Sequence, residues 1–396
     1  MRDIASDEVF DSILPEAVSK NGRLAARGKL YKELPDLSIT TDRRSVTLRA
    51  EGNSLVMVDG ISSSATAAEI SGEGLSNLIQ DRQSTMGLAM TSKVTVTQGG
   101  FDTFVAWEPV LRALLDARPV HEAGAVRFLD RGAEPLDLAR SFRLDDDPEE
   151  ISHFLHEAGF LHLRDVFDAD EMDAVGRDLD CAISQAAPDD GASWWAGDSQ
   201  GKQQAVRVLW FNEKSEALNT LLYDPRLQWL AGLTGDLRST KKMKAEGLVK
   251  PLDIKTGLSD LPWHKDCGQG MHSYYCNSMT VGISVTGADQ ESGALGVVPG
   301  SHRANLPTAG YDPNNDLLPI KLETQKGDVT VHCSDTLHRA HRPTTKPRKV
   351  VYTDFPLALR GNDVMPVEPK TLARKNRAAL TNVRDRISAS GGEQES

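Results

Sequence analysis

Apolar and polar residues alternate over short distances between residues 45 and 98, which is the pattern of half-buried β-strands. Gly, Asn and Ser separate these stretches, as expected for turns between strands. The alternation predicts strands at residues 45–50, 54–60, 86–91 and 93–98. Apolar residues recur at helical spacing over 72–83 and 101–115, which predicts a helix in each segment. Together these elements predict a small α+β domain.

The second half of the chain predicts helices followed by further strands. Pro148 opens a helical pattern, and Asp168 followed by Glu171 predicts a second helix with a capping box. The clearest strand is the alternating segment 279–285. Further elements are predicted as strands at 320–324, 328–333 and 349–355 and a C-terminal helix at 370–388. We expect these elements to form a β-sandwich or barrel preceded by helices.

The change of pattern along the chain predicts two domains. A length of 396 residues is also more than a single core usually organises. Residues 123–143 mix Gly, Pro and charged residues without sustained periodicity, which is typical of a connection between domains. We therefore expect an α+β domain at residues 1–122, a linker at 123–143 and a second domain at 144–396 that ends in the C-terminal helix.

Composition and charge narrow the class of protein. Hydrophobic residues make up 39% and charged residues 26% of the chain, which excludes global disorder. The 45 Lys and Arg residues against 57 Asp and Glu residues give a net charge of −12, which disfavours a nucleic-acid partner. No stretch has the roughly 18 apolar residues of a membrane helix. The four cysteines include no CxxC pair, which suits a reducing compartment. The sequence therefore predicts a cytoplasmic protein with no membrane span.

A histidine and an aspartate two residues apart are the first candidates for chemistry. On an extended segment His264 and Asp266 point to the same side, so they can bind one metal ion. A histidine cluster follows at His332, His338 and His341. One of these would complete a set of two imidazoles and one carboxylate, leaving positions open for a chelating cosubstrate and O2. A 2-oxo acid cosubstrate would need a cation for its distal carboxylate, and Arg348 follows the cluster closely.

Three linked motifs resemble the phytanoyl-CoA dioxygenase family of iron(II)/2-oxoglutarate oxygenases in order and spacing. They are LPWHKD at 261–266, SGALGVVPGSHR at 292–303 and GDVTVHCSDTLH at 327–338. Segment 149–175 is also similar to the start of that family's catalytic domain. The resemblance spans residues 141–356 and implies that the second domain is a double-stranded β-helix, a jelly-roll or cupin-like fold.

The resemblance implies a role for each matching residue. His264, Asp266 and His338 would be the ligands of Fe(II), and Arg348 would bind 2-oxoglutarate, with O2 as the further cosubstrate. The interval from His338 to Arg348 is ten residues, one fewer than is usual in the family, which leaves Lys349 as an alternative clamp.

Two further residues near these motifs are interpreted with their alternatives. Lys255 is a second candidate for the cosubstrate pocket, and a solvent-exposed lysine is the alternative. His332 is interpreted as a packed or hydrogen-bonded histidine rather than a ligand. Because a carboxylate stands at position 266, where related halogenases have a small residue, the resemblance implies a hydroxylase or an oxidative-rearrangement catalyst, with decarboxylation of 2-oxoglutarate to succinate.

The first domain carries a resemblance of its own. Segment 59–99 is similar to the middle section of sterol carrier protein 2-like domains. This resemblance implies an apolar tunnel that would hold a lipid, a sterol or an acyl thioester. A dimerisation or packing module is the alternative.

The sequence thus predicts an Fe(II)/2-oxoglutarate-dependent dioxygenase that hydroxylates an apolar small molecule such as a lipid, a sterol, a terpenoid or an acyl thioester. One alternative is an oxygenase of a polar metabolite or natural-product scaffold. The other is an inactive lipid-binding carrier. The expected partner is the small-molecule substrate, and a homo-oligomer is left open.

Overall fold

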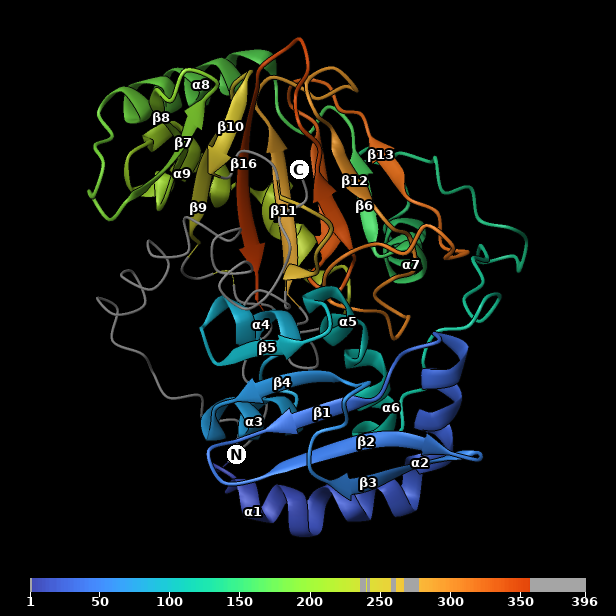
Figure 1. Ribbon diagram of the computed structural model, residues 1–396. Helices are drawn as coiled ribbons and strands as arrows, with labels where there is room; N and C mark the ends of the chain where they lie inside the picture. The colour runs from blue at the N-terminus through green and yellow to red at the C-terminus, as the bar shows by residue number, and fades with distance from the viewer. Residues whose placement is uncertain (1, 236–239, 241–242, 258–260, 267–277, 357–396) are drawn as a thin grey trace.

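A computed structural model describes residues 2–235, 240, 243–257, 261–266 and 278–356 of the chain. The described part contains two groups of elements, one built around each of two hydrophobic clusters (Figure 1). The predicted C-terminal helix at 370–388 lies outside the described residues.

The first group of elements is a mixed sheet with helices packed on it (Figure 1). Its strand order is β3-β2-β1-β4-β5, in which β1 and β4 are parallel and the other neighbours are antiparallel. Helix α2 packs against β3 and α6. The elements are α1 (Ser6–Glu8), η1 (Val9–Ile13), α2 (Leu14–Tyr31), β1 (Leu37–Thr40), β2 (Ser45–Glu51), β3 (Ser54–Asp59), β4 (Thr66–Ile70), α3 (Gly72–Ile79), α4 (Thr85–Met90), β5 (Val94–Gln98), α5 (Phe101–Ala106) and α6 (Glu108–Asp116).

The sequence prediction is correct for most of this group and wrong at one element. The expected strands at 45–50, 54–60 and 93–98 and the helices near 72–83 and 101–115 are confirmed. The expected strand at 86–91 is wrong, because these residues form helix α4. Ser84 caps this helix by accepting a hydrogen bond from the Gly87 amide. Every residue of α4 is buried, so its apolar run has no exposed face whose period could distinguish helix from strand.

A buried ion pair in the first group gives a testable dependence of stability on pH. Asp81 lies 3.3 Å from Arg112 and is 5% exposed. Burial raises the pKa of Asp81 to about 6, outweighing the opposite effect of Arg112. Because this pKa is higher in the folded than in the unfolded chain, the contribution of Asp81 to stability is present at low pH and is lost as the pH rises through about 6.

We therefore expect Asp81→Asn to become more stable relative to the unsubstituted protein as the pH rises. The expected gain in the free energy of unfolding is about 1 kcal/mol between pH 5 and pH 8, since the asparagine cannot ionise. Denaturant unfolding of both proteins at several pH values measures this difference. A difference that does not change with pH would show that Asp81 titrates normally.

The second group of elements is two antiparallel sheets that face each other (Figure 1). The larger has the strand order β10-β7-β8-β9-β16-β11-β14-β6, and the smaller has the order β13-β12-β15. One hydrophobic cluster contains residues of both, among them Val281 and Val331 of the large sheet and Val297 of the small one. This arrangement agrees with the expected double-stranded β-helix.

The helices predicted from Pro148 and Asp168 and the strands predicted at 279–285, 320–324, 328–333 and 349–355 are confirmed, and this group has further elements besides. Its elements are α7 (Pro148–Ala158), β6 (Phe160–Leu163), α8 (Ala169–Ser184), β7 (Ser193–Asp198), β8 (Gln203–Val208), η2 (Phe211–Glu213), α9 (Glu216–Leu222), α10 (Pro225–Gln228), η3 (Trp229–Gly232), β9 (Ala245–Lys250), β10 (Ile254–Gly257), β11 (Met279–Ser284), β12 (Leu295–Val297), β13 (Ile320–Leu322), β14 (Val329–Cys333), β15 (His338–Ala340) and β16 (Arg348–Phe355). The capping box predicted from Asp168 and Glu171 is confirmed at the start of α8. Helix α7 ends at Gly159, whose φ of 80° favours glycine.

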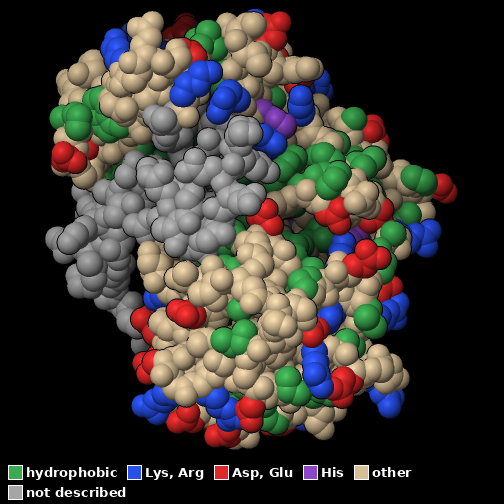
Figure 2. Space-filling view, viewed as in Figure 1, with side chains coloured by type: hydrophobic (Ala, Val, Ile, Leu, Met, Phe, Trp, Pro, Cys, Tyr) green, Lys and Arg blue, Asp and Glu red, His purple; other side chains and the backbone are tan. Residues whose placement is uncertain are grey.

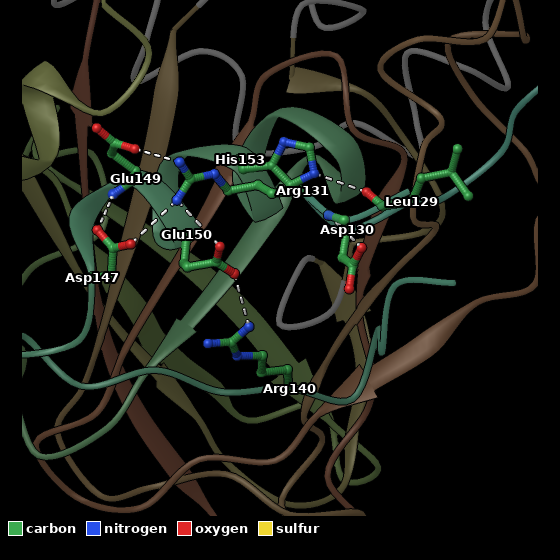
Figure 3. A network of polar contacts seen from close by, with 9 residues as sticks. Leu129, Asp130, Arg131, Arg140, Asp147, Glu149, Glu150 and His153 are labelled. Atoms are coloured by element: carbon green, nitrogen blue, oxygen red, sulfur yellow. Dashed lines mark hydrogen bonds and ion pairs between the residues drawn. The ribbon is translucent and has the colours of Figure 1, made fainter. Parts of the chain in front are cut away.

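The segment between the two groups is attached to the start of α7 by charged side chains. Arg131 forms ion pairs with three carboxylates there (Figure 3): Asp147, Glu149 and Glu150. Arg140 pairs with Glu150 at 3.2 Å. All of these side chains are exposed or partly exposed, so each pair contributes at most about 1 kcal/mol. The contacts nevertheless keep this irregular segment on the surface of the second group.

The surface of the molecule is charged and mixed. Figure 2 shows acidic and basic side chains interspersed over the first group of elements. Among the residues that the structure describes, none of the helices is both long enough and apolar enough to span a bilayer.

Candidate metal centre

The segment 261–266 lies beside β15, to which it is joined by an isolated antiparallel bridge between His264 and His338. The amide of His264 donates to the carbonyl of His338 and receives the reciprocal bond, both at 2.9 Å. The Asp266 amide donates to the Ser334 carbonyl at 3.0 Å. This pairing places the side chains of His264 and His338 next to each other, with ring centroids 4.2 Å apart.

Three candidate ligand atoms converge at this point. The Nε2 atom of His264 lies 3.6 Å from Asp266 Oδ1, and the Nε2 atom of His338 lies 3.5 Å from the same oxygen. Two atoms up to about 4.2 Å apart can both lie about 2.1 Å from one ion, which is the usual length of a bond from a metal to nitrogen or oxygen. Both histidine nitrogens lie within this range of Asp266 Oδ1, and all three ligand atoms lie within 4.8 Å of one another, so the three side chains are placed to share one divalent ion.

Both histidines are held in the tautomer that a metal ion requires. His264 Nδ1 lies 2.7 Å from the Pro262 carbonyl, and His338 Nδ1 lies 2.9 Å from the Thr336 carbonyl. A proton on Nδ1 that is donated to a carbonyl leaves Nε2 with its lone pair directed at the centre. Within the described part of the chain, the buried Nε2 of His264 has no hydrogen-bond partner. A bound cation would satisfy this atom, so the residues fit a metal ion.

The second oxygen of Asp266 is held by the large sheet. Thr280 of β11 donates to Asp266 Oδ2 at 2.6 Å, and Nε2 of His332 on β14 lies 3.3 Å from it. Thr280 and His332 are directly opposite each other in the β11–β14 pair. The interpretation of His332 as a hydrogen-bonded histidine is therefore confirmed. The two contacts turn Oδ1 towards the paired histidines.

Asp266 and the histidines around it shift one another's pKa values. Burial raises the pKa of Asp266, but His338, His264 and His332 outweigh this effect and hold that pKa well below its usual range. Burial lowers the pKa of His338, yet the facing Asp266 carboxylate outweighs it and raises that pKa. Burial and then His338 lower the pKa of His332 to about 4, so His332 is neutral at physiological pH. A cation at the centre would have to displace any proton that His338 shares with Asp266.

Arg348 and Lys250 form a buried cationic pair on the same sheet. They are directly opposite each other on β16 and β9, and they are 4% and 1% exposed. Residues directly opposite in a sheet face the same side, where two like charges repel unless an anion lies between them. Within the described residues no carboxylate forms an ion pair with Arg348, and its Nε has no hydrogen-bond partner. Lys250 Nζ donates to the carbonyl of His341.

Two other predicted candidates lie on the surface. Lys349, the alternative clamp, pairs with Asp180 at 2.6 Å outside the sheet. Lys255 pairs with Asp253 at 3.5 Å, and its side chain is 56% exposed. The geometry thus favours Arg348 over Lys349 as an anion-binding residue. It does not bring the Lys255 side chain into the buried group.

Sequence reasoning did not single out Thr280 or Lys250 as functional residues. Thr280 was assigned to the polar face of a strand, and its chemistry depends on the approach of Asp266 from a separate segment. The signal for Lys250 is faint, since it is one lysine at the end of a short alternating stretch, AEGLVK. Its burial follows only from the pairing of β9 with β16.

Comparison with known proteins gives one family match. Residues 155–350 match the family model described as phytanoyl-CoA dioxygenase. No curated protein sequence matches the chain.

Solved structures resemble part of the chain at low identity. One is the epimerase SnoN in complex with Fe3+, alpha ketoglutarate and nogalamycin RO, with 19% identity, 56% of this chain and 93% of that chain covered and a TM-score of 0.42. Another is EctD from S. alaskensis with 2-oxoglutarate and 5-hydroxyectoine, with 18% identity, 61% and 86% covered and a TM-score of 0.45. A third is EvdO2 from Micromonospora carbonacea var. aurantiaca complexed with 2-oxoglutarate, with 18% identity, 55% and 94% covered and a TM-score of 0.40. These similarities are too remote to assign a substrate.

Proposed function

We propose, from the premise that residues 155–350 belong to the phytanoyl-CoA dioxygenase family, that this enzyme hydroxylates an apolar small molecule. The protein is a non-haem dioxygenase that uses Fe(II), 2-oxoglutarate and O2. The proposal concerns which residues hold these groups and what kind of substrate is oxidised.

His264, Asp266 and His338 are the proposed ligands of Fe(II). The supporting observation is the convergence of their three ligand atoms, which all lie within 4.8 Å of one another. When bound, the iron supplies O2 activation coupled to the decarboxylation of 2-oxoglutarate to succinate and CO2, with transfer of one oxygen atom to a substrate C–H bond. The protein holds the ligands in place through Pro262, Thr336 and the contacts of Asp266 with the large sheet.

Arg348 is the proposed binding residue for the distal carboxylate of 2-oxoglutarate. The support is its burial and the absence of an ion-pair partner among the described residues. A guanidinium group can bind a carboxylate through two parallel hydrogen bonds. Lys250, directly opposite, would share the negative charge. Binding of the dicarboxylate would thereby also relieve the repulsion between the two cations. A role of Lys255 in binding the cosubstrate stays a prediction from the sequence, since its side chain is exposed and β7, β8 and β9 lie between β10 and β16.

The apolar substrate class is proposed from the resemblance of the first domain to sterol carrier protein 2-like domains. The large sheet also contains a second hydrophobic cluster, whose buried residues are at most 4% exposed and pack on one another. It lies on β7, β8, β10 and the residue after β8, separate from the main core, with Trp210 packed against it, and consists of Trp194, Ala196, Val206, Leu209 and Ile254. A polar metabolite or natural-product scaffold is the alternative substrate class. Succinate formation stimulated by long-chain acyl thioesters or sterols, but not by polar scaffolds, would support the apolar class. Stimulation by polar scaffolds, but not by acyl thioesters or sterols, would favour the polar substrate class instead.

The proposed domains are residues 1–122, a linker at 123–143 and a catalytic domain at 144–396. Two separate hydrophobic clusters support this division, one formed by residues between Val9 and Val120 and the other by residues between Phe142 and Phe355.

We further propose that the first domain is sterol carrier protein 2-like and holds the apolar substrate. Displacement of a fluorescent fatty acid from the full chain by candidate substrates tests this role. A cytoplasmic location and homo-oligomerisation stay predictions, the second checked by light scattering.

The test of the metal chemistry is spectroscopic. Fe(II) and then 2-oxoglutarate are added without O2 to metal-free protein, and the weak visible charge-transfer band of a chelated complex is measured. We expect a band in the unsubstituted protein and no band in His264→Ala. If folded, iron-bound protein gives no band, the chain is better explained as an inactive lipid-binding carrier.

A further inference from the structure

The segment 261–266, which carries His264 and Asp266, has a second neighbour besides β15. The Lys265 amide donates to the Thr308 carbonyl at 2.8 Å, and the Gly310 amide donates to the Trp263 carbonyl at 3.0 Å. His264 itself forms an antiparallel bridge with Ala309. The metal-ligand segment is therefore held between β15 on one side and residues 308–310 on the other.

Residues 308–310 are in turn attached to the first domain by a buried carboxylate. Thr308 Oγ1 donates to Glu108 Oε2 at 3.1 Å, and these residues are 2% and 3% exposed. The same oxygen of Glu108 accepts from the Thr85 amide at 2.8 Å and from the Thr85 hydroxyl at 2.5 Å. Hydrogen bonds to an ionised acceptor are stronger than those between neutral groups. Glu108 thus connects the start of α4 and the start of α6 to residues 308–310, which lie beside the metal-ligand segment.

Apolar contacts and further hydrogen bonds follow the same route. Leu261 and Ala309 both pack against the hydrophobic cluster of the first domain. Asn305 Nδ2 donates to the carbonyls of Pro109 and Arg118, both at 2.9 Å. The loop that contains residues 305–310 is therefore fixed by the segment that begins at Glu108. Figure 1 shows α4 and α5 directly beneath the two facing sheets, at the junction of the two groups of elements.

We propose that Glu108 is a positioning residue of the metal centre: by holding Thr308, it fixes residues 308–310, beside which the His264–Asp266 segment is aligned. The inference rests on the proposed function, since it assigns a supporting role towards the proposed iron ligands. The segment 261–266 is joined to each neighbour by one isolated bridge at His264, so the position of His264 depends on residues 308–310 and on the contacts that hold them. The first domain thereby positions part of the metal centre, in addition to its proposed role in binding substrate.

The test compares two isosteric substitutions of buried threonines. Thr308→Val removes the hydroxyl that contacts Glu108. Thr47→Val removes a buried hydroxyl of β2, which is 1% exposed and bonds only Ser38 and Gly60 of the first domain. The probe is Co(II), added without O2 to the metal-free full chain, and both its affinity and its visible d–d spectrum are measured. Thermal unfolding of the metal-free proteins measures stability separately.

We expect Thr308→Val to lower the Co(II) affinity about 10-fold and to change the spectrum, the size of effect seen when an outer partner of a metal ligand is lost. Thr47→Val should keep the affinity and spectrum of the unsubstituted protein even though its melting temperature falls. Glu108→Ala should lower the affinity further. Glu108→Gln should retain part of it, because the amide oxygen still accepts from Thr308.

Two results would overturn this role of Glu108. Equal Co(II) affinity and spectra in Thr308→Val and the unsubstituted protein would show that the contact does not position the ligands. Equal losses in Thr308→Val and Thr47→Val would show that only general stability is involved. If the unsubstituted protein itself binds no Co(II), the proposed iron ligands are wrong, which is a different failure. Thr308→Val carries the test even if Glu108→Ala does not fold.

Discussion

His264→Ala and Asp266→Ala are each expected to abolish 2-oxoglutarate-dependent turnover and to weaken Fe(II) binding by more than the roughly 100-fold that loss of an outer partner costs. Each change removes one of three converging ligand atoms, of which Asp266 Oδ1 lies 3.6 Å and 3.5 Å from the two histidine nitrogens. Binding measured by anaerobic titration, together with succinate formation, checks the result.

The fold itself should survive these substitutions. His264→Ala removes the Nδ1 contact with the Pro262 carbonyl, and Asp266→Ala removes the contacts with Thr280 and His332, so each variant should be less stable but still folded. The matched control is His162→Ala, which breaks another histidine–aspartate contact of the large sheet, with Asp328 at 2.8 Å. This control should retain Fe(II) binding and turnover. Full activity in His264→Ala or Asp266→Ala would exclude the proposed ligand set.

Arg348→Ala is expected to raise the 2-oxoglutarate concentration needed for half-maximal turnover by roughly 30- to 1,000-fold. The estimate corresponds to about 2 to 4 kcal/mol, the usual cost of removing one partner of a buried, charge-assisted pair. The side chain is 4% exposed and faces Lys250 across the sheet. Titration of 2-oxoglutarate into the anaerobic Fe(II) complex measures the same loss without turnover.

Lys349→Ala is the control for this prediction, because it removes the neighbouring cation from an exposed ion pair with Asp180. It should leave the 2-oxoglutarate requirement nearly unchanged. The 2-oxoglutarate requirement of Arg348→Lys should lie between those of Arg348→Ala and Lys349→Ala, because lysine keeps the charge but lacks the planar pair of donors. Arg348→Ala should also reduce the preference for 2-oxoglutarate over 2-oxo acids that lack a distal carboxylate. A large effect of Lys349→Ala instead would identify Lys349 as the clamp.

The elements with strong local signals were predictable, and those without them were not. Helix α7 and the capping box of α8 follow from a proline, an acidic cap and a periodic apolar stripe, all within a few residues. Helix α4 was mistaken for a strand because burial on all sides removes the period that separates the two. Helix α2 was not predicted, although its sequence contains Pro15 at the first turn.

Some residues of the candidate site could also be predicted from local sequence, whereas others could not. His264 and Asp266 could be singled out because they lie two residues apart, and two positions on an extended segment share one side whatever the rest of the chain does. His338 and Arg348 were candidates from their place in and after the histidine cluster, but His338 could be chosen over His332 and His341 only through the family resemblance. Distance along the chain says nothing of distance in space. The structure brings His338 beside His264 through an isolated bridge between β15 and the segment 261–266.

The sequence by itself determined the type of enzyme and the short motif that carries two of the proposed ligands, because both depend on residue identity and local spacing. Only the tertiary structure favours Arg348 over Lys349 as the proposed clamp. Adjacent residues of a strand face opposite sides, and the pairing of β16 with β9 and β11 decides which side is inside. The contacts of Thr280 with Asp266 and of Glu108 with Thr308 were likewise beyond the sequence, because each joins side chains from separate segments that meet only when the chain is folded.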